Sequence, residues 1–79
     1  MKGTEKQIKF ANDLLQEKVV SRVEKLKDRR PERVKFEIAL LEAINESTDA
    51  AKIIDVLQNL SSAQYGYENG HTTIQQLIS

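Results

Sequence analysis

The sequence contains no cysteine, so neither a disulfide nor a thiolate metal site contributes to its stability. Aromatic residues are also rare, because the 79 residues include two phenylalanines, two tyrosines and no tryptophan. A chain of this length forms one domain and buries a smaller fraction of its surface than a longer chain does. We therefore expect a single domain over residues 1–79, stabilised by aliphatic packing or by a partner.

Long apolar runs are missing as well. No stretch approaches the roughly 18 apolar residues of a membrane span, and the opening MKGTEKQIKF lacks the apolar run of a signal peptide. Hydrophobic residues make up 39% of the chain and charged residues 30%, a balance that favours folding over disorder. These features predict a cytoplasmic protein that does not cross a membrane.

Side chains suited to catalysis or metal binding are scarce. The three glycines stand apart, so the chain has no Gly-rich phosphate-binding loop. His71 is the only histidine and lies in a polar stretch beside Gly70. The acidic residues are spread singly along the expected helix surfaces, which does not favour a metal site. We predict that the protein is not an enzyme and has no catalytic residues, metal site, cofactor or small-molecule substrate.

Charges of both signs are plentiful but unevenly distributed. The formal net charge of the chain is zero. Residues 1–35 hold eleven basic and six acidic residues, a net charge of +5, whereas residues 36–79 hold one basic and six acidic residues, a net charge of −5. Such asymmetry indicates either a binding face or two halves that attract each other when folded.

The first amphipathic stretch opens with Thr4 and Gln7, whose spacing is that of a capping box at a helix start. Pro31 disfavours helical geometry in the residue before it, so we expect this helix to run from about Glu5 to near Asp28. Its apolar residues recur every three or four positions, at Ile8, Ala11, Leu15, Val19, Val23 and Leu26.

Two further helices are expected after this corner. The second spans residues 31–46, and its apolar positions are Val34, Phe36, Ile38, Leu40, Leu41 and Ile44. The third has Ser47 or Thr48 as its N-cap, Asp49 in its first turn and an apolar side over residues 50–60. Three amphipathic helices joined by short corners predict an all-α fold, a small bundle.

The first helix is too long for its neighbour. About 24 residues at 1.5 Å each make it roughly 36 Å long, whereas about 16 residues make the second helix roughly 24 Å long. The excess apolar stripe needs a cover: the helix kinks near Gln16–Lys18, or the end of the chain folds over it, or a second copy packs there. Halves of opposite charge favour an antiparallel homodimer.

The last stretch, residues 61–79, is ambiguous. Asn69 and Gly70 form a dipeptide typical of two-residue hairpin turns. Alternatively, Thr72 or His71 caps a short C-terminal helix. We favour the short helix, because an isolated hairpin is only marginally stable in water, and we expect residues 61–79 to form a loosely held tail.

The segment GTEKQIKFANDL resembles the opening of small uncharacterised proteins from Gram-positive bacteria and their phages. Those proteins begin with Thr, a spacer, Lys-Gln-Ile, a second spacer, an aromatic residue and Ala, and the matching positions are Thr4, Lys6, Gln7, Ile8, Phe10 and Ala11. AQYGYEN is similar in place to their second aromatic segment, although they tend to have tryptophan there. Similar openings occur in modules attached to DNA-processing proteins. The resemblance implies a bacterial or phage origin and no particular activity.

Basic residues form the strongest candidate binding surface. Four of them form a basic row along the first helix, at steps of four, three and four: Lys18, Arg22, Lys25 and Arg29. Three more, Arg30, Arg33 and Lys35, extend the set around the corner at Pro31. Clustered cations of this kind suit phosphates. They are also typical of side chains that cover the edge of an apolar stripe with their methylenes.

Glu37 lies among apolar positions of the second helix rather than on its polar strip. A buried carboxylate needs a partner or a proton. We expect it to be partly exposed near the helix start and paired with Arg33 or with an arginine of the first helix. The alternative is that Glu37 faces a partner chain.

These features favour a non-enzymatic protein-interaction or regulatory accessory protein of bacterial or mobile-element origin. Its partner is then another protein or a second copy of itself. The alternative is an accessory protein that binds nucleic acid weakly, without sequence preference, through the basic row. Such binding depends on phosphates, because residues 11–35 contain no aromatic side chain to stack on bases. The net charge of zero argues against it.

Overall fold

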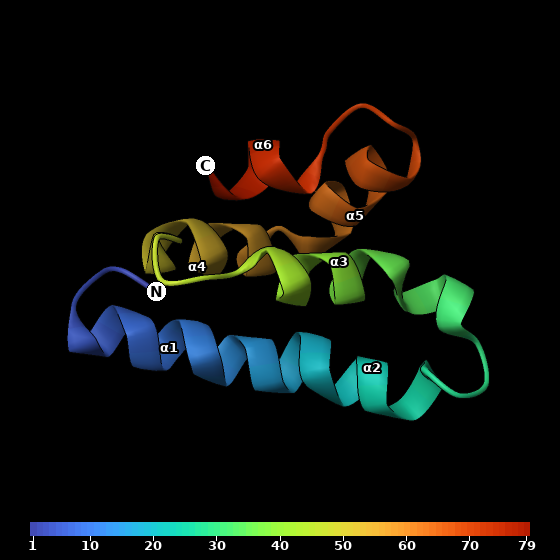
Figure 1. The fold of residues 1–79 in the computed structure, drawn as a ribbon, viewed down its shortest axis with the longest axis horizontal. Coiled ribbons are helices and arrows are strands. Elements are labelled where there is room, and N and C mark those ends of the chain that lie inside the picture. The colour runs from blue at the N-terminus through green and yellow to red at the C-terminus, as the bar shows by residue number, and fades with distance from the viewer.

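The computed structural model describes residues 1–79, and its helices lie in three layers (Figure 1). The first layer is one continuous rod, made of α1 (Glu5–Leu15), the π-helical segment η1 (Gln16–Val20) and α2 (Ser21–Leu26). The middle layer holds α3 (Lys35–Ala43), preceded by the 3₁₀ turn η2 (Pro31–Val34), and α4 (Ala50–Gln58). The third layer holds α5 (Leu60–Glu68) and α6 (Ile74–Ile78). The chain is therefore all-α, as its periodicity predicts.

The start of α1 is a capping box, as the sequence predicts. The backbone N–H of Gln7 donates to the hydroxyl of Thr4 at 3.1 Å, and the N–H of Thr4 donates to the side-chain oxygen of Gln7 at 3.0 Å. These two bonds satisfy backbone donors that the first turn of a helix leaves free. Such a local signal fixes the place where the rod begins.

The rod changes from α-helical to π-helical geometry at Gln16–Val20, close to Gln16–Lys18, where a kink was one of the three expected ways to cover the excess stripe. A π-helical turn holds more residues than an α-helical turn, so it rotates the following helix about its axis. Before this segment α1 packs chiefly against α4, and after it α2 packs against η2. The long apolar stripe is thus divided between two different neighbours within the chain.

The second predicted helix is shorter than expected, because α3 ends at Ala43 rather than at residue 46. Ile44 is extended, with φ −71° and ψ 129°. Asn45 then forms a tight turn in which its side-chain oxygen accepts from the N–H of Ser47 at 2.8 Å. Asparagine competes for backbone hydrogen bonds in this way, and it thereby ends the helix.

The N-cap of α4 is Asp49, so the prediction of Ser47 or Thr48 is wrong. The Asp49 carboxylate accepts from the N–H of Ala51 at 2.9 Å. Thr48 is instead buried, and its hydroxyl accepts from the N–H of Asn45 at 3.0 Å. The negative charge of an aspartate at this position is also stabilised by the positive end of the helix dipole.

A separate helix, α5, follows α4, and the sequence reasoning missed it. The chain bends at Asn59, whose φ is −115° and ψ 36°, and becomes helical again at Leu60. Asn69 and Gly70 end α5 instead of forming a hairpin turn. Gly70 has φ +74°, a left-handed conformation that glycine adopts readily after a helix. The hairpin alternative is therefore wrong.

The short C-terminal helix is confirmed, although its cap is Thr73 rather than Thr72 or His71. The N–H of Gln76 donates to the Thr73 hydroxyl at 3.2 Å, and the Gln76 side chain accepts from the N–H of Thr73 at 2.8 Å. Ile74 and Ile78 are each 8% exposed and belong to the hydrophobic core. This packing places the end of the chain against the middle layer.

One hydrophobic core joins the three layers. Its most buried large side chains are Phe36, Leu40, Ile53, Leu57 and Val19. Phe36 of α3 also meets Tyr67 of α5 edge to face, with ring centroids 5.4 Å apart. None of the helices combines the length and apolar character required to span a membrane.

Candidate interaction surfaces

The first two residues of the basic row, Lys18 and Arg22, contact other helices of the same chain. The Lys18 ammonium donates to the backbone oxygen of Leu57 at 3.3 Å, at the end of α4. Arg22 Nε lies 3.2 Å from a carboxylate oxygen of Glu37 on α3. These two contacts tie the rod to the middle layer, so neither side chain is wholly available to a ligand.

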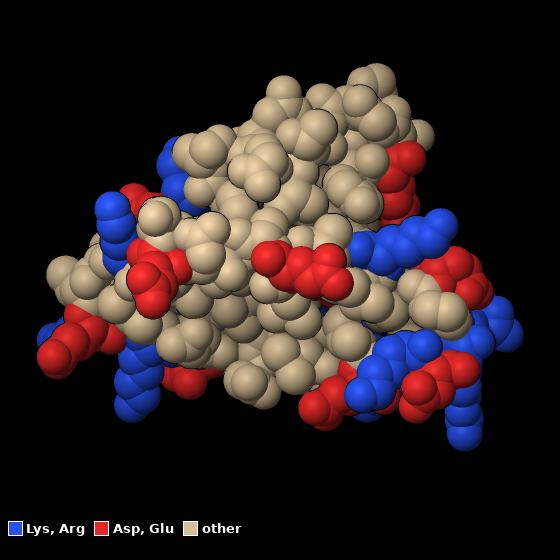
Figure 2. Space-filling view, in the orientation of Figure 1, with Lys and Arg blue, Asp and Glu red and all other residues tan.

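The second half of the row and the corner are exposed. The cations Lys25, Arg29, Arg30, Arg33 and Lys35 form no ion pair within the chain. Exposed acids are interspersed among them, namely Glu24, Asp28 and Glu32. Figure 2 shows this mixture of blue and red near the end of α2, at the lower right. The corner is therefore a surface of mixed charge and not a continuous basic face.

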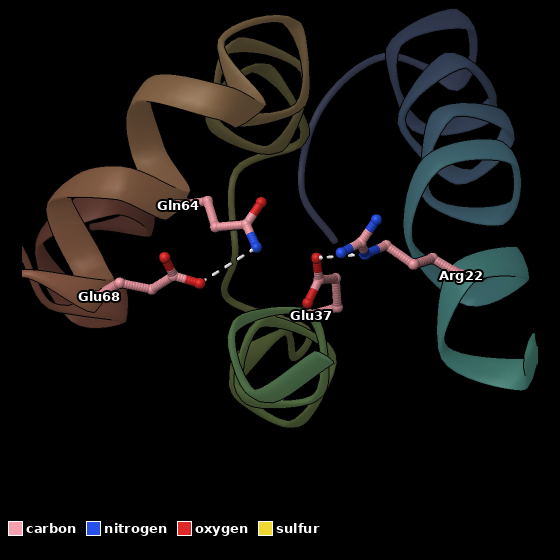
Figure 3. A network of polar contacts seen from close by, with 4 residues as sticks. All are labelled: Arg22, Glu37, Gln64 and Glu68. Carbon is pink, nitrogen blue, oxygen red and sulfur yellow. Dashed lines mark hydrogen bonds and ion pairs between the residues drawn. The ribbon is translucent and has the colours of Figure 1, made fainter. Parts of the chain in front are cut away.

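Glu37 is the most unusual charged residue of the chain, because none of its side chain is exposed. Arg22 reaches it from α2, as Figure 3 shows, and remains 46% exposed. The two groups are within ion-pair distance, but neither oxygen of Glu37 accepts a well-aligned hydrogen bond. The predicted pairing with an arginine of the first helix is thus confirmed, and Arg33 is not the partner.

Full burial also corrects two expectations for Glu37. It is not partly exposed, and no part of it lies on a surface that a partner could contact. The physical cause is the position of α3 between the rod and α5. This arrangement covers the side of α3 that carries Glu37 (Figure 3). Burying a carboxylate with only one imperfect ion pair lowers the free energy of unfolding, so Glu37 is an energetically unfavourable residue in the core.

A groove of about 510 Å³ lies along the outward side of α3. Its apolar lining comes from Pro31, Ile38, Ala39 and Tyr67. Three exposed charged residues complete the lining, Glu32, Lys35 and Glu42, and none of them has an ion-pair partner within the chain. The volume is within the range of ligand-binding clefts. Sequence reasoning missed the groove, since Tyr67 contributes to it only because α5 is helical.

Two large apolar side chains are exposed, Phe10 at 46% and Tyr65 at 67%. Phe10 lies on α1, one turn from Lys6 on one side and from Asp13 on the other. Tyr65 lies on α5, in the third layer, which carries almost no charge at the top of Figure 2. Phe10 is thus an aromatic side chain on the solvent side of the rod, flanked by charges of opposite sign.

Comparisons of the chain with models of protein families, with curated proteins and with solved structures gave no match.

Proposed function

We propose that the protein is a non-enzymatic interaction protein, an accessory or regulatory factor of bacterial or mobile-element origin, that binds a helical segment of a protein in the groove on α3. The observation that carries the proposal is the groove itself. It combines apolar side chains with three charged residues that have no partner within the chain. An amphipathic helix that lies in an apolar groove is a recurring mode of protein recognition.

The groove suits such a helix in its chemistry. Ile38 and Ala39 are half-buried side chains of α3, and Tyr67 contributes from α5. The charged residues are distributed along the length of α3, with Lys35 near its start and Glu42 near its end. Apolar contacts supply affinity, whereas charges at the edge select the partner and its orientation.

Reversing the charges of the groove is expected to abolish partner binding. The double variant Lys35→Glu/Glu42→Lys should fold normally, because both side chains are exposed and unpaired. Its net charge is unchanged, because one charge of each sign is exchanged. The wild-type protein, immobilised and incubated with cell extract, should retain a protein that the variant retains about tenfold less. Quantitative mass spectrometry of the bound fraction measures this ratio.

The matched control is Lys52→Glu/Asp55→Lys, which makes the same two changes on exposed residues of α4. This control should retain the partner as the wild type does. Equal retention by all three proteins would contradict the proposal, because the groove would then play no part in binding.

A second candidate function is nucleic-acid binding through the exposed corner. The observation that favours it is that Lys25, Arg29, Arg30 and Arg33 form no ion pair within the chain. The acids interspersed among these cations weaken the attraction of the corner for a polyanion. Of the seven predicted cations, Lys18 and Arg22 contact other parts of the chain and Lys35 lines the groove, so about four phosphate contacts remain.

Four phosphate contacts predict that log K falls against log salt with a slope of about −3.6 on duplex DNA. Fluorescence anisotropy of a labelled duplex at several salt concentrations measures this slope. Replacing the four cations by glutamine should remove binding and leave the melting temperature unchanged, because all four side chains are exposed. Absence of binding by the wild type at low salt would exclude this function.

A further inference from the structure

The exposed face of α1 matches the groove of α3 residue by residue when the two helices run antiparallel. Placing Phe10 opposite Ile38 puts Lys6 opposite Glu42, because each is four residues from the aligned pair. The same register puts Asp13 opposite Lys35, three residues away on the other side. Residues three and four apart share a helix face, so all six side chains can meet along one seam.

We propose that the groove binds a second copy of this chain, with Phe10 of one copy inserted between Lys35 and Glu42 of the next. The inference rests on the proposed function of the groove and names its occupant. One apolar contact and two pairs of opposite charge form in this register. A parallel arrangement with Phe10 opposite Ile38 instead puts Asp13 near Glu42, where two acids repel each other.

The residues that form this contact are free in a single copy. Lys6, Asp13, Lys35 and Glu42 are exposed and form no ion pair within their own chain. Phe10 is 46% exposed, whereas the other phenylalanine of the chain is 1% exposed. The buried side chains of α1 are Ala11, Leu14 and Leu15, and α1 packs chiefly against α4, so a contact made by its exposed side chains leaves the core unchanged.

The two surfaces of the contact differ, so the contact is heterologous. Each copy offers one Phe10 and one groove, and the copy that donates its Phe10 still has its own groove free. Copies therefore join head to tail, and the average mass increases with concentration unless the rotation between copies closes a ring.

Sedimentation velocity at low salt, from low micromolar to about millimolar concentration, tests this association. The wild type should exceed its monomer mass of 9.0 kDa as the concentration rises. Lys6→Glu and Glu42→Lys should each weaken association about five- to tenfold, because each places two like charges opposite one another. Phe10→Ser should weaken it at least about tenfold.

Two matched controls separate this register from a general effect of charge or of lost apolar surface. Lys9→Glu changes the neighbouring lysine, which lies opposite Ala39 rather than opposite a charge. Tyr65→Ser removes the other exposed aromatic side chain. Both controls should associate as the wild type does.

Mixing Lys6→Glu with Glu42→Lys gives the sharpest result. The new acid of one variant then lies opposite the new lysine of the other, and the unchanged Lys6 of the second variant lies opposite the unchanged Glu42 of the first, so both contacts between unlike copies have the correct sign. The mixture should therefore associate about as strongly as the wild type, with the two variants alternating, although each variant alone associates about five- to tenfold more weakly.

A wild type that remains at 9.0 kDa throughout, or a mixture that remains monomeric, would overturn the inference. Loss of partner retention in the Lys35→Glu/Glu42→Lys variant would leave the proposed function standing in that case, with a different protein as the occupant. Failure of both experiments would remove both proposals.

Discussion

Leu40→Ala is expected to lower the free energy of unfolding by about 2–5 kcal/mol. Leu40 has no exposed surface and lies in the core that joins the three layers. Truncation loses the transfer free energy of the removed carbons and leaves a cavity that the surrounding helices fill only in part. A domain of this size has a total stability of only about 3–5 kcal/mol, so the variant should be largely unfolded.

The matched control is Leu41→Ala, one residue further along α3. Leu41 is half-buried, whereas Leu40 is fully buried, and the two substitutions change helix propensity equally. Urea denaturation followed by circular dichroism should show a loss at Leu41 that is smaller by at least about 1 kcal/mol. Equal losses at the two positions would mean that the orientation of α3 is different from the one described.

Arg22→Ala should lower the free energy of unfolding by about 1–3 kcal/mol, because it leaves the buried carboxylate of Glu37 without a partner. Removing one member of a fully buried ion pair costs about 3–5 kcal/mol. The smaller range applies here, since Arg22 is 46% exposed and solvent screens the pair. Denaturation curves of the variant and the wild type at neutral pH give the difference directly.

Glu37→Met should have the opposite sign and raise the stability by about 1–2 kcal/mol. It replaces a charge that accepts no well-aligned hydrogen bond by an apolar side chain of similar length, and Arg22 can turn to solvent. Lys25→Ala is the control for the arginine, because Lys25 is exposed, belongs to the same row and has no ion pair. Equal losses for Arg22→Ala and Lys25→Ala would show that the ion pair contributes nothing.

The sequence was sufficient where the signal was local. Thr4 and Gln7 are three residues apart, so their capping box depends on nothing beyond the first turn. The corner at Pro31 was equally clear, since proline restricts the residue before it. Predicted and observed ends of the rod differ by two residues, Asp28 against Leu26, which is the usual uncertainty of a helix boundary.

The sequence was insufficient where tertiary packing decides the structure, and α5 is the clearest example. Its residues include two serines, a glycine and two tyrosines, none of which favours a helix strongly. The helix depends on the packing of Tyr67 against Phe36 and on Gly66, where a Cβ would lie 2.9 Å from the Thr72 hydroxyl. Neither contact is visible as a pattern in the chain.

The candidate surfaces show the same division between local and tertiary information. The spacing of Lys18, Arg22 and Lys25 placed them correctly along one rod. Which of them remains free depends on Leu57 and Glu37, which come from other helices. The groove likewise needs α3 and Tyr67 together. Periodicity predicts a face of a helix, whereas a binding surface is made by two or more elements.

The packing of α1 against α4 also has a consequence for biosynthesis. The two helices are adjacent in space but separated in the chain by residues 16–49. At about 5–20 residues per second, a ribosome needs roughly 2–7 s to advance from the end of α1 to the start of α4. During that interval the first helix lacks its native partner, because its contacts with α4 form only after the later residues have been synthesised.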